Sequence, residues 1–396
     1  MKHICLYFQV HQPFRLRQIS FFNITNKVPY FNDASNKQIL LKVAKNCYLP
    51  TNKLFLELLK QYPFLKLSFS ISGTAIDQFK KYAPQVIESF QALLETGSVE
   101  LLSETNCHSL ACVKGKAFFV NEVTAHRHKM KEVFAYEPKV FRNTELIYSN
   151  KVGSWVKSLG YEAMLTEGAD KVLNGRSPNQ LYHHSTDNNL KILLKNYRLS
   201  DDIAFRFSNR KWPHWPLTAE KFADWIHQLP DSEEIINLFM DYETFGEHQW
   251  KSTGIFEFLE DLPGSILKYK DHTFITPSEA VAKLKSRDSF SALTPISWAD
   301  EERDLSAWLG NNMQLEAFDF LYALSKKVNR TNNDEMSRIW DYLQTSDHFY
   351  YMSTKTLDDG AVHAHFSPYN SPHQAFTNYM HVLMNFEYQL DKLLRR

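Results

Sequence analysis

The sequence contains little cysteine and no metal-binding or disulfide pattern. Four cysteines occur in 396 residues, and no two of them stand in a C-x-x-C spacing. This usage argues against zinc knuckles and against a disulfide scaffold, and it favours reduced thiols in a cytoplasmic protein. The first residues have too short an apolar stretch for a signal peptide, which agrees with a cytoplasmic location.

Net charge and long apolar runs are also missing. Lys+Arg and Asp+Glu are both 45, so the formal net charge is zero and gives no reason to expect a nucleic acid or an anionic membrane as partner. No run of about twenty apolar residues occurs, which excludes an ordinary transmembrane helix. No glycine-rich phosphate loop follows the first apolar run, so a nucleotide-binding doubly wound sheet has little support.

Short apolar runs alternate with amphipathic segments over the first 290 residues. This alternation predicts a parallel α/β barrel, irregular and possibly incomplete, whose active site lies at the carboxyl ends of the strands; a doubly wound sheet is the main alternative. Residues 14–48 are predicted to be a long binding loop. Strands are expected at 4–10, 65–72, 99–102, 139–142, 163–166, 191–194, 235–240 and 273–276, and helices at 52–61, 84–95, 114–134, 150–159, 218–229, 255–269 and 278–285.

The pattern changes to longer helical segments at 313–328, 334–345 and 372–394. We therefore predict a barrel domain over residues 1–290 and a helical C-terminal region over 291–396, which packs on the barrel and completes the active-site face. The connector at 346–352 has the polar and aromatic character of a segment able to reach back to that face.

Acidic residues gather where predicted strands end. The apolar run 235–240 leads into Asp241, Glu243 and His248, and crowded acids raise the free energy unless they share protons or bind a ligand. A solvated loop is the plain alternative. A glycosidase needs two such carboxyl groups, one as a carboxylate at the anomeric carbon and one as a proton donor. Spacing alone does not choose the pair among Glu100, Glu104, Glu145, Glu167, Asp241 and Glu243.

Other side chains suit the recognition of sugars. His11 and Gln12 each offer a donor and an acceptor to hydroxyl groups, although His11 could equally be a histidine that merely ends a strand. Arg142 is placed to keep Glu145 ionised, with a surface ion pair as the alternative. Indole rings stack on sugars, so Trp250, Trp298 and Trp308 are candidate platforms, against the alternative of core tryptophans.

Five clusters, in their order along the chain, resemble the motifs of glycoside hydrolase family 57, in its short, intracellular, α-amylase-like branch. His-Gln-Pro alone is a weak match, whereas the fourth cluster and the order of all five are specific. The first cluster lacks the histidine-x-histidine of branching enzymes, which argues against branching activity. The clusters are His11-Gln12-Pro13, Gly97-Ser98-Val99-Glu100-Leu101-Leu102, Phe141-Arg142-Asn143-Thr144-Glu145-Leu146, Met240-Asp241-Tyr242-Glu243-Thr244-Phe245-Gly246-Glu247-His248, and the segment 298–311.

The resemblance implies a retaining enzyme acting on α-glucans or maltooligosaccharides, built on an incomplete (β/α)7 barrel with no cofactor and no metal requirement for the chemistry. It implies Glu145 as nucleophile and Asp241 as general acid and base. Hydrolysis, glucan transfer and the oligomeric state are left open. The residues expected to contact substrate are His11, Gln12, Glu100, Arg142, Glu243, His248, Trp250, Asp304 and Trp308.

Two rival functions remain on the sequence. A metal-dependent polysaccharide deacetylase or mannosidase would draw its ligands from His11, His108, Asp241 and His248, although the expected His-x-x-x-His or His-x-Asp spacings are absent. A non-catalytic glucan-binding protein would use the same aromatic platforms without turnover. The presence of both Glu145 and Asp241 argues against that second rival.

Overall fold

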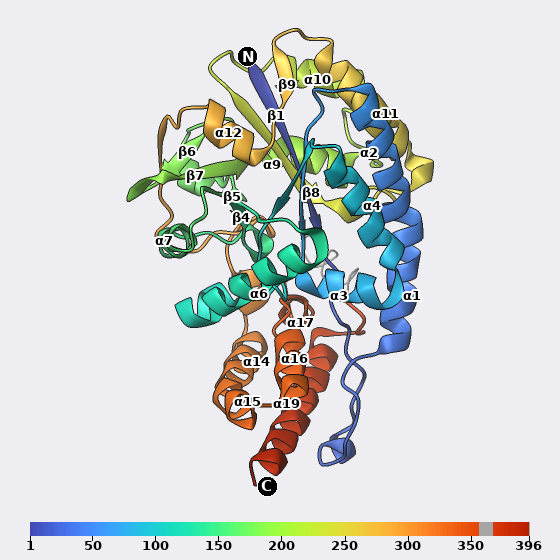
Figure 1. Ribbon diagram of the computed structural model, residues 1–396, viewed down its shortest axis with the longest axis vertical. Helices are drawn as coiled ribbons and strands as arrows, with labels where there is room; N and C mark the ends of the chain where they lie inside the picture. The colour runs from blue at the N-terminus through green and yellow to red at the C-terminus, as the bar shows by residue number, and fades with distance from the viewer. Residues whose placement is uncertain (356–366, 396) are drawn as a thin grey trace.

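Parallel strands form an irregular (β/α)7 barrel, as predicted. The computed structural model describes residues 1–355 and 367–395. In order round the barrel the strands are β1 (Lys2–Val10), β2 (Leu67–Ile71), β3 (Val99–Leu102), β4 (Val140–Arg142), β5 (Ala163–Glu167), β7 (Asp187–Lys195) and β8 (Ile235–Asp241) (Figure 1). Strands β2, β3 and β5 are buried along their whole length, as near-continuous apolar runs in a parallel sheet predict.

The barrel consists of two sheets that meet at two seams. One sheet has the order β3-β2-β1-β8, with β9 (His272–Phe274) on the start of β1, and the other has β10 (Asp288–Phe290), β6 (Tyr182–His184), β7, β5 and β4. An isolated parallel bridge between Ser103 and Phe141 joins β3 to β4. At the other seam, Asn196 donates its backbone N–H to the carbonyl of Asn237 at 2.9 Å. These isolated contacts explain why the barrel is irregular.

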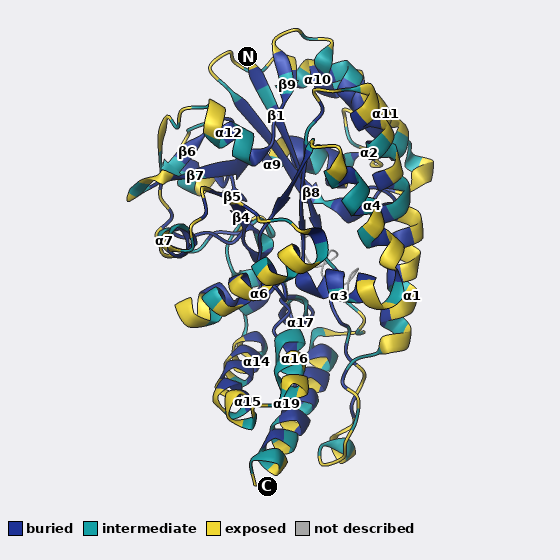
Figure 2. Ribbon diagram, in the orientation of Figure 1, coloured by how far each residue is buried: buried dark blue, intermediate teal, exposed yellow. Residues whose placement is uncertain are grey.

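Helices surround the barrel, and their buried faces make most of its outer core (Figure 2). Thr218 caps α10 by accepting from the backbone N–H of Lys221, which confirms the predicted start of that helix. The helical segments of the first 290 residues are η1 (Phe21–Asn23), α1 (Asp33–Val43), η2 (Ala44–Tyr48), α2 (Leu49–Gln61), α3 (Gly73–Tyr82), α4 (Pro84–Glu95), α5 (Ala111–Lys114), α6 (Lys116–Phe134), η3 (Thr144–Leu146), α7 (Asn150–Ser158), α8 (Asp170–Leu173), α9 (Tyr197–Asp201), η4 (Asp202–Arg206), α10 (Ala219–His227), η5 (Tyr242–Thr244), η6 (Lys251–Thr253), α11 (Ile255–Leu267) and α12 (Pro277–Lys283).

The C-terminal region is helical and lies beyond the carboxyl ends of the strands (Figure 1). One buried apolar cluster contains both Phe141 of β4 and Phe318 of this region, so the two parts share a core. Among the residues that the structure describes, no helix is long and apolar enough to cross a membrane. The helices are α13 (Ser306–Leu309), α14 (Asn312–Ala323), α15 (Ser325–Thr331), α16 (Asp334–Leu343), α17 (Asp347–Tyr350) and α19 (Pro372–Leu394).

Two predictions about local structure were wrong, and several elements were not predicted. The second half of the expected loop 14–48 is helical, because Asn32 caps α1 and the buried residues Asn36, Leu40 and Val43 recur at helical spacing. Helix α3 and the short strands β6 and β10 were not predicted at all. The single helix expected at 313–328 is two helices, α14 and α15, which meet at Leu324.

Candidate active site

A cavity of about 740 Å³ lies at the carboxyl ends of the strands, where the sequence places its acidic clusters. Pockets of this size suit a small ligand or a few sugar units. Its lining comes from both parts of the chain, including Glu145 after β4, Asp241 at the end of β8, and Asp347 of α17. The barrel and the helical region therefore build one site together.

Glu145 lies in a strained turn directly after β4. Its φ is +55° and that of the following Leu146 is +53°, in the left-handed region that side chains with a Cβ seldom adopt. Contacts on both sides hold the turn: the backbone N–H of Leu146 donates to the Asn143 carbonyl at 2.9 Å, and that of Trp298 donates to the Glu145 carbonyl at 3.1 Å. The surrounding structure thus fixes where this carboxylate points.

Both carboxylate oxygens of Glu145 accept hydrogen bonds. Trp298 Nε1 lies 2.6 Å from Oε2, while His108 Nε2 and Ser346 Oγ lie 3.1 and 3.4 Å from Oε1. Burial raises the pKa of Glu145, but the bonds from His108 and Trp298, with the positive charges of His108 and Arg142, outweigh it and hold the pKa below its ordinary value. The site therefore keeps Glu145 ionised.

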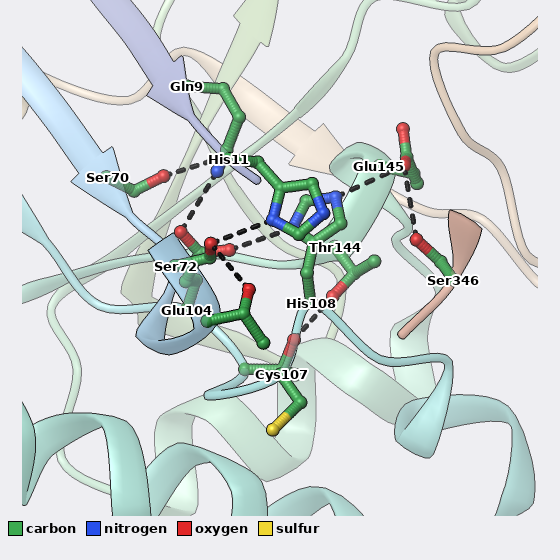
Figure 3. Close-up of polar contacts among 12 residues, drawn as sticks. Gln9, His11, Ser70, Ser72, Glu104, Cys107, His108, Thr144, Glu145 and Ser346 are labelled. Carbon is green, nitrogen blue, oxygen red and sulfur yellow. Dashed lines mark hydrogen bonds and ion pairs between the residues drawn. The ribbon is translucent and has the colours of Figure 1, made fainter. Parts of the chain in front are cut away.

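His108 stands between two carboxylates (Figure 3). Its Nδ1 lies 3.0 Å from Glu104 Oε2, and its Nε2 faces Glu145. Burial lowers the pKa of His108, whereas the bonds to Glu104 and Glu145 raise it, to about 9 in total. The same contact lowers the pKa of Glu104 to about 2, against its complete burial. Glu104, His108 and Glu145 thus form a hydrogen-bonded series of charged groups, of which His108 and Glu145 line the cavity.

His11 stacks on His108, with ring centroids 4.0 Å apart. Its Nδ1 lies 2.7 Å from Ser72 Oγ and its Nε2 lies 2.9 Å from Asp347 Oδ2. Burial, and then the charge of His108, lower the pKa of His11. Asp347 follows α16, and the neighbouring Ser346 contacts Glu145, so the prediction that this connector reaches the barrel face is confirmed.

Asp241 and Glu243 differ from Glu145 in the direction of their pKa shifts, since the pKa of each is raised and that of Glu145 is lowered. Burial, followed by the negative charge of Glu145, raises the pKa of Asp241 to about 6. Burial, followed by the charge of Asp241, raises the pKa of Glu243 to about 8, and the Tyr48 hydroxyl donates to Glu243 Oε1. A carboxyl group that keeps its proton near neutral pH can act as a general acid.

Arg142 helps to keep Glu145 ionised, as predicted, but it does not reach the cavity as a substrate contact would. The Arg142 side chain is fully buried below the cavity, with its guanidinium carbon 4.8 Å from the centre of the Trp298 ring, and its three nitrogens have no hydrogen-bond partner among the described residues. Lys195 Nζ lies 5.2 Å from the same ring. Trp298 therefore lines the cavity while its ring faces two cations and its indole N–H donates to the nucleophile.

Besides Glu145, six of the predicted site residues line the cavity and four do not. Glu100 bonds to the backbone N–H and hydroxyl of Ser278 away from the cavity, Trp250 is 67% exposed outside its lining, and Asp304 accepts hydrogen bonds from Ser306. The roles expected of these three residues as substrate contacts therefore do not fit their positions, and neither does that of the buried Arg142. The cavity is lined by His11, Gln12, Asp241, Glu243, His248 and Trp308.

Metal ligands do not converge at this site. His11, His108, Asp241 and His248, which a metal-dependent hydrolase would need, do not form a group of ligand atoms among the described residues. The one group found there, His227, Asp271 and His272, lies near the start of β9, at the other end of the barrel (Figure 1). The four ligands expected for a metal-dependent hydrolase therefore do not lie together.

Sequence reasoning named Glu104 only as one of six acids at strand ends and His108 only as a ligand of the rival metal enzyme, and it gave no part to Ser346 or Asp347. Glu104 and His108 are four residues apart just beyond β3, and that proximity to a strand end was the available signal. No signal in the sequence pairs Ser346 with Glu145, because 201 residues separate them. Long-range pairing of this kind depends on how the helical region docks.

Comparisons with known proteins identify the family and the fold of the chain. Residues 5–293 match the family model for glycosyl hydrolase family 57. A Methanocaldococcus jannaschii protein, provisionally named alpha-amylase, is 44% identical over 98% of this chain and 85% of its own length. The branching enzyme of Pyrococcus horikoshii aligns with a TM-score of 0.70 at 14% identity over 100% of this chain and 95% of its own. The alpha-amylase AmyC of Thermotoga maritima aligns with a TM-score of 0.62 at 12% identity over 100% and 98%.

Proposed function

Because the chain belongs to glycosyl hydrolase family 57, we propose that it is a retaining enzyme that cleaves α-1,4-glucosidic bonds by double displacement. The observation that carries this proposal is that the pKa values of two carboxyl groups at one cavity shift in opposite directions: that of Glu145 is held below its ordinary value, while that of Asp241 is raised to about 6. The family relationship and the α-amylase-like relative support an α-glucan as substrate.

In the first step, Glu145 attacks the anomeric carbon. One carboxylate oxygen forms the bond to that carbon while the glycosidic bond breaks, so a covalent glycosyl-enzyme results. The donors on Glu145, Trp298 and His108 above all, hold the carboxylate in one orientation, which reduces the entropic cost of reaching the attacking geometry.

Asp241 provides the proton for the leaving oxygen. After the leaving group departs, the ionised Asp241 takes a proton from a water molecule or from a sugar hydroxyl, which then attacks the anomeric carbon and releases Glu145. Glu243, with a pKa of about 8, stays protonated next to it and can donate a hydrogen bond to a sugar hydroxyl. Water as acceptor gives hydrolysis, and a second glucan gives transfer.

The domain boundary at residue 290 stays part of the proposal. Residues 291–305 contact the barrel, since Ile296 bridges to Tyr148 and Trp298 bonds to Glu145. We place this segment with the helical region because both close the same face of the cavity. The cytoplasmic location likewise remains a proposal, which the four free and buried cysteines support.

The function is tested by incubating the purified protein with maltoheptaose in the presence of a chelator. Products are resolved by chain length, and proton NMR records the anomeric form of the first reducing end released. The proposal predicts α-anomeric products, with shorter chains alone for hydrolysis and chains above seven units for transfer. A β-anomeric first product would contradict the double displacement.

The Glu145→Gln variant serves as the control in the same assay. It keeps the shape of the side chain but lacks the nucleophilic carboxylate, so its product pattern should match a blank without enzyme. Activity of the wild type that disappears in chelator would favour the metal-dependent hydrolase. Binding of maltoheptaose by the wild type without any turnover would favour a glucan-binding protein.

A further inference from the structure

His108 is held more firmly than any role in simple packing requires. Its φ is +51°, so both it and Glu145 adopt left-handed backbone conformations at the point where they meet. The backbone N–H of His108 donates to Thr105 at 3.2 Å, and its carbonyl accepts from Ser346 at 2.9 Å. The ring of His11 covers one face of its imidazole. Such strain persists only where surrounding contacts enforce it.

The partners of His108 require a charged ring. Ionised carboxylates only accept hydrogen bonds, and each ring nitrogen faces one, Glu104 Oε2 at 3.0 Å and Glu145 Oε1 at 3.1 Å. Both nitrogens therefore carry a proton. His11 differs, because Asp347 accepts from one of its nitrogens and the Ser72 hydroxyl can donate to the other, so a neutral His11 is fully satisfied.

We propose that His108 is a positioning residue for the nucleophile: clamped between Glu104 and Glu145, its imidazolium fixes the direction of the Glu145 carboxylate and keeps it ionised for attack. This inference rests on the proposed function for the identity of the nucleophile. It assigns Glu104 a role as well, since the distal carboxylate secures the second proton of the ring.

The charges round His108 favour this state. Negative groups outnumber positive ones, and each comes from a different element of the fold. Burial opposes the charge, and the net result is a pKa of about 9. The titratable and charged groups facing it are Glu104 beyond β3, Glu145 in η3, Asp241 at the end of β8, Asp347 in α17, Arg142 in β4 and His11 beyond β1.

The consequence for Glu145 has a definite sign. A positive charge at 3.1 Å stabilises the carboxylate, so removing it raises the pKa of Glu145 and moves the acid side of the rate profile to higher pH. The pKa of Asp241 also rises, because the charge of His108 lowers it in the wild type. Both sides of the profile should therefore move in the same direction.

The test replaces His108 by Gln, which retains a neutral donor of similar reach. We expect kcat on maltoheptaose to fall by about ten- to a hundredfold with KM changed by less than about threefold, and the acid limb to rise by about one pH unit. The matched control is His184→Gln, another buried histidine, which bonds to the Asn150 carbonyl away from the cavity and should leave both limbs in place.

Two results in that assay would overturn the inference. An increase in KM with no shift in the pH–rate profile would show that His108 contacts substrate. A lower melting temperature with no shift in that profile would show that its role is purely structural. Glu104→Gln should shift the acid limb in the same direction by a smaller amount. An unchanged limb in that variant would refute the part assigned to Glu104.

A second readout does not depend on activity. The protonation of His108 is followed by NMR of labelled histidine side chains, with its signals assigned by their loss in the His108→Gln variant. The ring should remain an imidazolium up to at least pH 8 in the wild type and titrate at lower pH in Glu104→Gln. Titration near 6.5 in the wild type would contradict the inference even if no glucan were cleaved, so its failure is separable from failure of the proposed function.

Discussion

The turn that carries Glu145 and the strand end that carries Asp241 shift the pKa of a carboxyl group in opposite directions. Both carboxyl groups are half-buried at one cavity, and this burial alone raises the pKa of each. Trp298 and His108 donate to Glu145, which reverses the effect of burial there. Asp241 instead feels the negative charge of Glu145, which adds to burial. The number of donors decides which acid loses its proton.

The protonation states of Glu145 and Asp241 also depend on one another. Ionisation of Glu145 helps to keep Asp241 protonated, and a protonated Asp241 places no second negative charge beside the nucleophile. Burial that would be costly for a pair of carboxylates is thus acceptable for a carboxylate and an acid.

Glu145→Gln should have the largest effect on activity. Removing the nucleophile is expected to lower kcat on maltoheptaose by at least about a thousandfold, with little change in the melting temperature. Release of reducing ends and thermal unfolding measure the two quantities. Glu100→Gln is the matched control, since it makes the same exchange at a buried carboxyl group outside the cavity.

Asp241→Asn should lower kcat/KM by about 10² to 10⁴-fold, because it removes the proton donor but leaves the nucleophile. The loss should be much smaller on α-maltosyl fluoride, since fluoride departs without protonation. Added azide should restore turnover and yield a glycosyl azide, because this nucleophile needs no general base. Equal losses on both substrates would show that Asp241 does not supply the proton.

The wild-type pH profile should be bell-shaped. Glu145 must be ionised, so activity is present above its pKa, which is lower than ordinary, and is lost as the pH falls through it. Asp241 must be protonated, so kcat/KM declines as the pH rises through about 6. Initial rates between pH 3 and 9 test this. An alkaline limb that disappears in Asp241→Asn, while the acid limb remains, would assign the two limbs.

Trp298→Phe should reduce kcat by about tenfold and raise the acid limb, because it removes the indole donor from Glu145 Oε2 and leaves the ring. Trp340→Phe is the control, since that indole donates to the Leu321 carbonyl in the helical region. A shift of the acid limb in both variants would mean that the change is not specific to the nucleophile.

Glu100→Gln should have the smallest effect, a change in kcat of less than about twofold, because hydrogen bonds at this position concern packing rather than substrate. Its carboxylate accepts from Ser278 at the start of α12. A severe loss of activity without loss of stability would return Glu100 to the substrate site, where the sequence prediction placed it.

Glu100 and Glu104 show how far the sequence could lead. Glu100 lies within β3 and Glu104 two residues beyond its end, and four residues of extended chain span up to about 13 Å. Alternation along a strand predicts which face a side chain lies on but not its position along the barrel axis. That position decides whether Glu100 or Glu104 reaches the nucleophile. The pattern of apolar runs was enough to predict the barrel, because strands that are buried along their length have apolar residues at most positions.

Contacts between distant segments were beyond the sequence. Residues 345–347 dock on the barrel through Ser109, Glu145 and His11, and only the folded chain brings these together. Helix α3 was not predicted, although Ser72, the last residue of the strand expected at 65–72, is its N-cap. The position of acids at strand ends left six candidates, and the choice of Glu145 and Asp241 among them came from the family resemblance.

The most direct test of the account is to trap the covalent intermediate. The protein is incubated with 5-fluoro-α-maltosyl fluoride, whose ring fluorine slows the second step more than the first, and the modified peptide is identified by mass spectrometry. The account predicts one maltosyl adduct on Glu145 and none in Glu145→Gln. An adduct on another carboxylate, or steady turnover of maltoheptaose with no adduct at any residue, would contradict Glu145 as the nucleophile.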